Sequence, residues 1–429
     1  RVVTRIYTPG SLYEESLIGT DDVAGLAAIS VKGDGVGIAI LDASTGHVWT
    51  MEHQGDERWS RLLDDLLRSN PKELVFSPRD ADREEVRNVI SQLDGITLSQ
   101  HTSSRRKGQD TLKNILEVAD LGHIDLGDSP LAMDAAGIAA DYLAAMHIVD
   151  SIDFREVEIM QPKGNMILDQ TTLRNLELTQ TLAGEKEGSL LGAIDKCRTS
   201  MGRRTLKQWI LRPLATKDKI EERQDSVATI ARSSKRLDDL RNNLKGLRDM
   251  ERLATQLSYN RSGGRDLVAI GLALERMPHL KSLCLEVDDH LLNKLASDLD
   301  VLEMMRIDIQ ANLNDQQPLS LRDGGIIREG IDNKLDELRE AAAKGHQWFK
   351  DLEVRERAKL EIPSLKVRHN RQIGWYIEVT KTHLSKVPED WNRRQQMTNG
   401  NRYVTEELVE WEEKLVTAAS KANSIEYDM

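Results

Sequence analysis

The chain has 429 residues, of which 59 are Lys or Arg and 71 are Asp or Glu, giving a net charge of −12. It has no run of about 18 apolar residues, which excludes a membrane-spanning helix, and its two cysteines are too few for a disulfide framework. This composition predicts a soluble protein of a reducing compartment with roughly two to four domains, and its acidic total argues weakly against nucleic-acid binding by the whole chain.

The first 150 residues alternate short apolar runs with amphipathic segments. Turn sequences rich in Gly separate the first three runs, which predicts three consecutive antiparallel strands. The predicted strands span residues 25–31, 36–41, 47–51, 73–77 and 96–98. The predicted helices span residues 56–68, 82–92 and 131–145. Together they indicate a compact α/β domain with a mixed sheet flanked by helices.

Asp42, at the end of the second predicted strand, is the most enzyme-like residue of this domain. Metal-assisted phosphoryl chemistry needs at least two converging carboxylates, and the later strands offer only Glu73 at a strand start. An Asp before Ser44 and Thr45 also caps a turn, which is the favoured interpretation. A nuclease that uses Asp42 remains the alternative, and we predict no catalytic or metal-binding residue.

From about residue 152, strand patterns nearly vanish and helical periodicity continues for roughly 180 residues, which predicts an all-α domain. Two later segments, 331–359 and 406–429, carry apolar or small residues at alternating spacings of three and four. The first segment places Leu335, Leu338, Ala342, Gly345, Phe349 and Leu352 in this pattern. The second places Leu408, Trp411, Leu415, Ala418, Ala422 and Ile425. Each set forms a narrow apolar stripe along one side of a helix, which we call a seam. The two seams predict two long helices that pair in antiparallel fashion.

Residues 362–403, between the two helices, return to strand-like patterns and predict a small β-rich tip. Within residues 366–402, eight Lys and Arg face three Asp and Glu, a net charge of about +5. A basic tip on a long arm suits phosphate contacts to duplex DNA, which position a protein without reading sequence. The alternative is a helical scaffold that never contacts DNA. Trp375 and Tyr376 are expected in the core of the tip rather than stacked on bases.

Several segments, in their order along the chain, carry a family resemblance: residues 5–12, 41–46, 173–178, 189–191, 199–214, 249–253, 324–330, 365–367 and 374–379. The most specific match is the succession of residues 173–178, 189–191, 199–204 and 209–214. Its last two segments read Thr-Ser-Met-Gly-Arg-Arg and Trp-Ile-Leu-Arg-Pro-Leu. Over nearly the whole chain, these segments resemble the MutS family of DNA mismatch-repair proteins.

The resemblance implies a multidomain protein that combines α/β and all-α parts. Residues 1–150 would form an RNase H-like connector without nuclease activity, and residues 151–345 a helical core and lever. Residues 346–405 would form the clamp, and 406–429 the start of the returning helix. The sequence contains no Gly-x-x-x-x-Gly-Lys-Ser/Thr phosphate loop. We therefore expect a fragment that lacks the family's ATPase domain and does not itself hydrolyse ATP. Because the resemblance begins at the connector-like segment, we also expect the family's mismatch-reading domain to be missing from it.

The resemblance also implies function. The clamp would hold duplex DNA nonspecifically, while lever and connector transmit signals. The resemblance implies DNA contacts by Asn370, Arg393, Arg394, Asn399 and Arg402. The local excess of Lys and Arg adds three further candidates, Lys366, Arg368 and Arg371. The fragment is expected to hold no cofactor. The full-length protein is expected to be a DNA-dependent ATPase with ATP and Mg in its ATPase domain, a dimer, and a partner of MutL through the connector. Its expected location is the cytoplasm or nucleoid of a bacterium or archaeon, or the nucleus or mitochondrion of a eukaryote.

Overall fold

The computed structural model describes residues 8–11, 25–116, 118, 129–146, 156–159, 164–258, 262–320, 323–370 and 373–429. The chain divides into two compact units. Unit 1 comprises Arg1–Ser262 and Ala269–Arg306, and unit 2 comprises Gly263–Val268 and Ile307–Met429. Among the described residues, no helix has both the length and the apolar character needed to cross a membrane.

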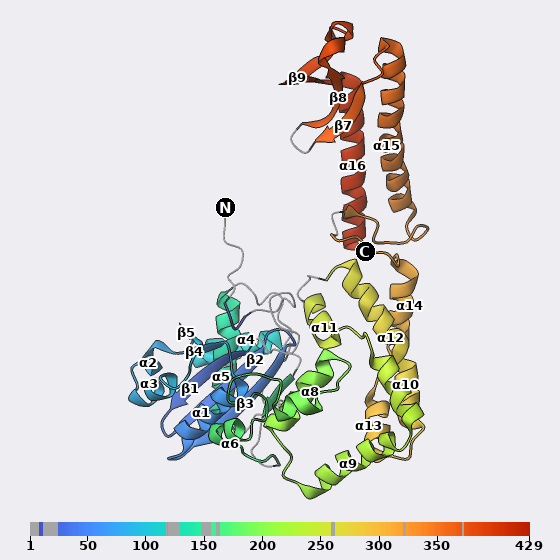
Figure 1. Cartoon of the computed structure of the whole chain (residues 1–429). Coiled ribbons are helices and arrows are strands. Elements are labelled where there is room, and N and C mark those ends of the chain that lie inside the picture. Colours follow the sequence, from blue (N-terminus) through green and yellow to red (C-terminus); the bar gives the residue numbers. More distant parts are fainter. Residues whose placement is uncertain are drawn as a thin grey trace. The chain divides into compact units, whose positions relative to one another are not determined.

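A six-stranded sheet forms the centre of the first part of unit 1, in the order β5-β4-β1-β2-β3-β6 (Figure 1). Its strands are β1 (Gly25–Lys32), β2 (Gly35–Asp42), β3 (His47–Gln54), β4 (Glu73–Phe76), β5 (Thr97–Gln100) and β6 (Glu156–Ile159). The first three strands are antiparallel, as predicted. β4 and β5 continue the sheet in parallel beside β1, and β6 lies parallel to β3. The sequence patterns did not predict β6.

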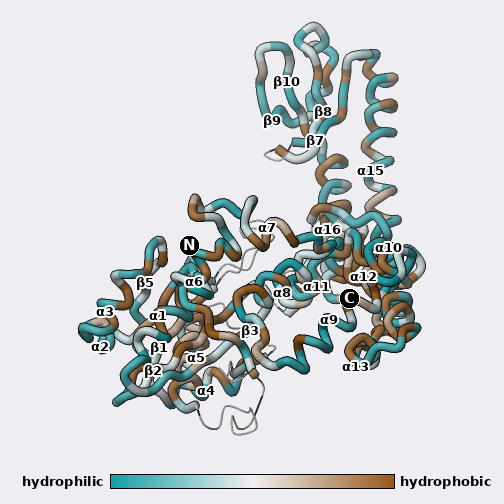
Figure 2. Tube along the Cα trace, turned by 60° about the horizontal axis from the view of Figure 1, so that its bottom comes forward, coloured by the Kyte–Doolittle hydropathy of each residue, from teal (hydrophilic) through white to brown (hydrophobic). Residues whose placement is uncertain are grey.

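Helices cover both faces of this sheet. One face packs against α5 (Pro130–Ala145) and α4 (Arg105–Ile115), and the sequence patterns did not predict α4. The other face packs against α1 (Arg58–Ser69) and α3 (Glu84–Ile90), and the short α2 (Pro78–Ala81) precedes α3. Because the central strands are buried on both faces, they are almost continuously apolar, as Figure 2 shows for the strands and α5.

Glycine lets α5 approach the sheet closely. A Cβ atom added at Gly37 would lie 2.0 Å from the backbone oxygen of Leu131. Gly108 of α4 and Gly137 of α5 face each other in the same way, with 2.9 Å between an added Cβ and the partner's backbone. Side chains at these positions would push the helices outward, so these glycines set the thickness of the layer.

The rest of unit 1 is almost entirely helical, as predicted. Its helices are α6 (Gln170–Asn175), α7 (Leu190–Ile194), α8 (Ser200–Leu211), α9 (Lys217–Ala231), α10 (Ser234–Leu244), α11 (Met250–Ser258) and α13 (His290–Asp298). Two more, α12 (Gly264–Leu285) and α14 (Glu303–Asn312), include residues of both units. Asp169, Ser189 and Thr199 each accept a backbone N–H bond that caps the helix following them.

A long helical pair dominates unit 2 and confirms the two predicted helices. α15 (Asn333–Leu360) and α16 (Glu406–Asp428) lie side by side (Figure 1). They run antiparallel, because Arg355 bonds Glu407 near one end while Arg339 bonds Glu426 near the other. Their buried residues follow the predicted seams: Leu335, Gly345, Phe349 and Leu352 on α15, and Leu408, Leu415, Ala418 and Ala422 on α16.

A four-stranded antiparallel sheet, the tip sheet, joins the two helices. Its order is β7-β8-β10-β9, with β7 (Lys366–Asn370), β8 (Gly374–Thr380), β9 (Asn392–Met397) and β10 (Gly400–Val404), and the 3-10 helix η4 (Lys381–Lys386) follows β8. Trp375 stacks on Phe349 of α15 with ring centroids 4.0 Å apart, and Tyr376 is buried. Both residues therefore belong to the core of the tip, as predicted.

Candidate nucleic-acid interface

Strand pairing aligns four side chains across the tip sheet. Lys366 pairs with Glu378, Glu378 pairs with Arg402, and Arg402 pairs with Gln395. Side chains alternate along a strand, so this row and the adjacent Arg368 occupy one face, which we call the outer face. The opposite face, with Ile377 and Tyr403, belongs to the hydrophobic cluster that includes α15 and α16.

Arg402 is held within the outer face by three contacts. Its Nε lies 3.5 Å from Glu378 Oε2, and its Nη1 donates a 2.8 Å hydrogen bond to Gln395 Oε1. Its guanidinium carbon lies 4.4 Å from the centre of the Tyr376 ring, a cation–π contact. The side chain is only 15% exposed. Much of its charge is balanced inside the sheet, which leaves less of it to attract a phosphate.

Arg393 and Arg394 have different surroundings, because they lie on the edge strand β9. All six residues of β9 are exposed. Gln395 pairs with Arg402 whereas Arg393 pairs with Tyr403, so Arg394 is an extra residue at a β-bulge. In the described part of the chain, neither guanidinium forms an ion pair, including with the nearby Glu389 and Asp390. Two successive cations are thus available to an external anion.

The other predicted residues are distributed around this edge and face. Lys366 and Arg368 are exposed on β7, the opposite edge strand, and neither is ion-paired among the described residues. Asn399 is exposed in the turn before Gly400, and Asn370 is half-buried at the end of β7. Arg371 lies outside the described residues. The structure therefore brings Lys366, Arg368 and Arg402 onto one face and places Arg393, Arg394 and Asn399 on the β9 hairpin.

Two glutamines of β9 were not predicted from the sequence. Gln395 orients Arg402, and Gln396 presents an exposed amide opposite Asn401. Amide groups can donate hydrogen bonds to phosphate oxygens, as the predicted asparagines would. The sequence did contain an indication that these glutamines could contact DNA. They belong to the run Asn-Arg-Arg-Gln-Gln-Met, which contains no acidic residue.

Asp42 has a structural role in the turn after β2. Its carboxylate accepts hydrogen bonds from Ser44 N at 2.9 Å and from Ser44 Oγ at 2.7 Å. The side chain is buried, and this burial raises the pKa of Asp42 despite the bonds from Ser44. The described residues contain no group of three His, Cys, Asp or Glu that could hold a metal ion. Nothing in this geometry supports the nuclease alternative.

Comparisons with known proteins match the chain in two segments. The family descriptions MutS domain II and MutS domain III match residues 24–148 and 171–424. Proteins described as DNA mismatch repair protein MutS, from Desulforamulus reducens and Symbiobacterium thermophilum, are 33% and 35% identical to all of this chain. A protein of the same description from Methanosarcina barkeri is 32% identical. The chain spans about half the length of these curated relatives, 50%, 49% and 50% respectively.

Proposed function

The chain belongs to the MutS family, and we propose that it is the DNA-holding and signal-transmitting part of a mismatch-repair protein. The tip sheet acts as a clamp that binds the phosphate backbone of duplex DNA. The observation that carries this proposal is a pair of exposed arginines, Arg393 and Arg394, at the end of a long helical arm. Neither forms an ion pair with any residue that the structure describes. Lys366 and Arg368 add charge on the other edge strand.

Phosphate contacts give affinity but no sequence information. Each phosphate that a cation neutralises releases counterions, so affinity falls with salt by a slope of about 0.9 per contact on a double logarithmic plot. The chain's net charge of −12 opposes DNA at long range. We therefore expect binding to be weak, salt-sensitive and local to the tip.

The helical pair supports the proposed role of a lever. At its base, Glu426 of α16 accepts hydrogen bonds from Gly325 N at 3.0 Å and from Ile326 N at 3.2 Å. The same carboxylate bonds Arg339 of α15. One buried side chain thus ties both helices to the segment before α15, so a displacement of the pair is passed to that segment.

The sheet of unit 1 supports a connector role. Three antiparallel strands continued by parallel strands and covered by helices agree with an RNase H-like connector. Its proposed task is docking, including of a MutL-type partner, rather than catalysis. In the full-length protein, we propose that a separate ATPase domain binds ATP and Mg, that the protein forms a dimer, and that it acts in the cytoplasm on the nucleoid.

Fluorescence anisotropy with labelled duplexes at low salt tests this function. The 429-residue chain should bind a G·T duplex and a G·C duplex with the same affinity, because only backbone contacts are made. A clear preference for the mismatch would contradict a purely backbone-holding clamp. Complete lack of binding would favour the helical scaffold without DNA contact. Addition of Mg²⁺ should leave both duplexes uncleaved, and a cleavage activity that Asp42→Asn abolishes would favour the nuclease alternative.

A further inference from the structure

A basic groove lies within unit 1, and none of its lining residues belongs to the tip sheet. It has a volume of about 810 Å³ and is lined by residues of β2, β3, α1, α6, α7, α8 and the loops beside them. Seven of its lining residues are Lys or Arg, and only one, Asp94, is acidic. This excess of positive charge contrasts with the acidic chain as a whole, in which Asp and Glu outnumber Lys and Arg by 71 to 59.

Three of the seven cations already have carboxylate partners. Arg68 donates a 3.0 Å hydrogen bond to Asp65, and Lys186 lies 3.1 Å from Asp195. Arg204 is buried and bonds both Asp249, at 2.5 Å, and Glu251. These three side chains contribute to the walls of the groove, and their charge is balanced locally.

The other four cations are Lys72, Arg174, Lys207 and Arg212. None of them is ion-paired with any carboxylate that the structure describes. Lys72 and Arg174 are exposed, and Lys207 and Arg212 are half-buried. Four unbalanced positive charges around one groove repel one another unless an anion lies between them.

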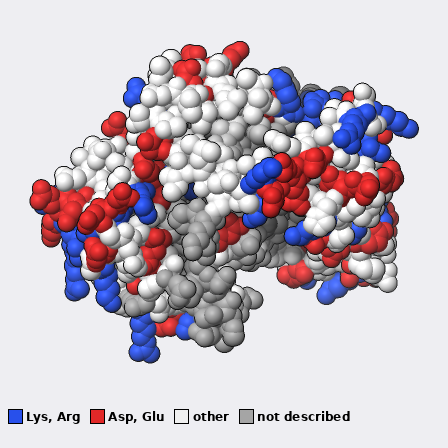
Figure 3. All heavy atoms as spheres, turned by 90° about the horizontal axis from the view of Figure 1, so that it is seen from below, with Lys and Arg blue, Asp and Glu red and all other residues white. Residues whose placement is uncertain are grey.

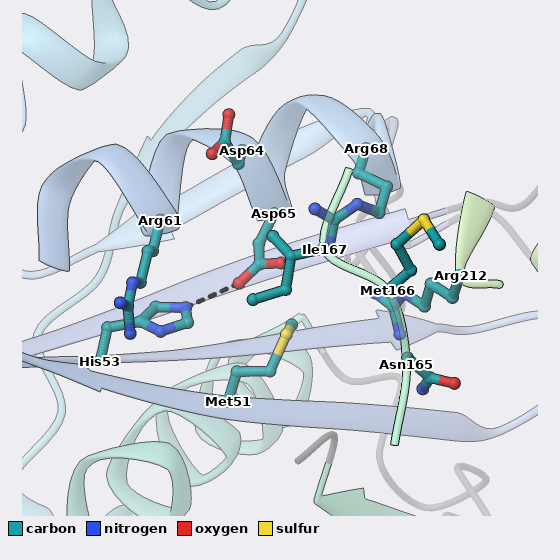
Figure 4. A pocket seen from close by; sticks show the side chains of 10 residues that line it. All are labelled: Met51, His53, Arg61, Asp64, Asp65, Arg68, Asn165, Met166, Ile167 and Arg212. Atoms are coloured by element: carbon teal, nitrogen blue, oxygen red, sulfur yellow. Dashed lines mark hydrogen bonds and ion pairs between the residues drawn. The ribbon is translucent and has the colours of Figure 1, made fainter. Parts of the chain in front are cut away.

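Arg212 is the most desolvated of the four. It also lines a smaller adjoining cavity of about 80 Å³, where Figure 4 shows it beside Met166 and Asn165. Burial lowers the pKa of Arg212 to about 10, and the attraction of Asp65 offsets only part of this effect. Asp65 is itself engaged by His53 at 2.7 Å. Arg212 therefore stays protonated at neutral pH, and it forms no ion pair with the carboxylates that the structure describes.

An apolar wall faces the same groove. Trp49 is half-buried, Leu173 is half-buried, and Leu182 is 62% exposed. The amides of Asn70 and Gln208 also line the groove. The volume lies within the range of about 300–1,000 Å³ that is typical of small-molecule sites, which are largely apolar with a few polar groups. A duplex is too large for such a site, whereas a nucleotide fits its size and chemistry.

We propose that this groove binds a multiply charged phosphate ester of nucleotide size. Lys72, Arg174, Lys207 and Arg212 neutralise its phosphates, and the wall that contains Trp49 contacts its apolar part. Guanidinium groups suit this task because they donate two parallel hydrogen bonds to phosphate oxygens. The site is independent of the clamp proposal, since it shares no residue with the tip sheet.

Isothermal titration of ADP into the 429-residue chain, at low salt and without divalent cations, tests the proposal. ADP should bind, and Arg174→Ala combined with Lys207→Ala should weaken it by about 100-fold, with about tenfold from each charge-assisted hydrogen bond that is removed. The matched control is Arg79→Ala with Lys235→Ala, which removes the same charge from exposed positions of unit 1 outside the groove and should leave ADP affinity unchanged. Because Arg174→Ala with Lys207→Ala could alter folding, a second variant, Lys72→Gln, provides a milder change at an exposed position and should also weaken ADP binding.

Four results would overturn the proposal. The first is that ADP does not bind the folded chain. The second is that pyrophosphate binds as tightly as ADP, which would remove the role of the apolar wall. The third is that a Glu-rich peptide binds more tightly than ADP and loses affinity in the Arg174→Ala, Lys207→Ala variant, which would assign the groove to an acidic protein segment. The fourth is that the Arg174→Ala, Lys207→Ala variant retains its ADP affinity, which would exclude these two cations as phosphate-binding residues.

Discussion

Arg402 and Arg394 lie on neighbouring strands of the tip sheet, yet their charges have different surroundings. Arg402 is paired with Glu378 and stacked on Tyr376, whereas Arg394 is exposed on a bulged edge strand. The sequence assigned both to phosphate because both add to the same local excess of Lys and Arg. Only the cross-strand register distinguishes them, and register depends on pairings between residues far apart in sequence.

Replacing Arg402 should mainly affect the fold of the tip. Arg402→Ala leaves Glu378 without its partner and uncovers Tyr376, at a cost of about 1–2 kcal/mol in the free energy of unfolding. The dependence of duplex affinity on salt should hardly change. Arg394→Ala, the control, should do the opposite and lower the slope by about 0.9. A larger slope change in Arg402→Ala than in Arg394→Ala would contradict this assignment.

The buried pair of Arg204 and Asp249 makes unit 1 sensitive to acid. Burial alone would raise the pKa of Asp249, but the hydrogen bonds and charge of Arg204 outweigh it and lower that pKa. A carboxyl whose pKa is lower in the folded state stabilises the fold above its unfolded pKa of 3.8. That stabilisation is lost as pH falls below this value through the folded pKa.

Asp249→Asn should therefore lower the free energy of unfolding at pH 7 by about 3–5 kcal/mol, because Arg204 loses a buried partner. The difference from the parent chain should shrink at pH 3, because Asp249 takes up a proton in the unfolded parent chain below its unfolded pKa of 3.8, which favours unfolding. Urea unfolding at the two pH values measures this. Asp238→Asn on the exposed side of α10 is the control and should be nearly neutral at both. A difference that grows on acidification would exclude the stated role of the pair.

Of all the elements, the helical pair was the most predictable from the sequence. The buried charged residues at its helix–helix interface were the least predictable. The spacing of apolar residues predicted α15 and α16 because a narrow stripe repeated every three and four residues suits only paired helices. Glu356 and Glu426 continue the stripe as buried carboxylates, which the pattern did not indicate. Glu426 is satisfied by Arg339 and by two backbone N–H groups of a distant segment, so its burial depends on tertiary contacts.

Gly345 allows the two helices to approach at the middle of the pair. An added Cβ atom would lie 3.0 Å from Leu415 Cδ1 and 3.3 Å from Leu415 Cβ. Gly345→Leu should therefore destabilise the helical pair by about 1–3 kcal/mol through overpacking, although leucine favours helices. Ala343→Leu, at an exposed position of the same helix, is the control and should not destabilise. Equal midpoints of thermal unfolding for both variants would show that Gly345 does not lie at the interface between the two helices.

At the scale of the whole chain, local patterns predicted most of the elements but not every strand of the large sheet. The buried central strands β1 and β2 are long apolar runs between Gly-rich turns, so the sequence predicted them. β6 has only four residues, Glu-Val-Glu-Ile, and exists through its parallel pairing with β3. α4 is strongly polar, so the sequence patterns did not predict it. Like β6, it depends on tertiary contacts, because its helix is stabilised by packing on α5.

The distribution of charge also matters more than its total. On the face drawn in Figure 3, acidic and basic side chains are interspersed. Residues 366–402 instead carry a net charge of about +5 within a chain of −12. The net charge of the whole chain argued against DNA binding, and only the charge of this one segment indicated it. To identify the cations that are unpaired among the described residues, the strand pairings and the ion pairs of the folded tip are needed.

In the proposed function, exposed cations at the edge of the tip sheet hold the DNA backbone. The most direct test is the slope of log affinity against log salt for one duplex, measured with the parent chain and with Arg393→Ala, Arg394→Ala. Arg79→Ala with Lys235→Ala, at exposed positions of unit 1, controls for the removal of two charges. We predict that the tip variant flattens the slope by about 1.8 and the control leaves it unchanged. An unchanged slope in the tip variant, with its thermal stability intact, would contradict the claim.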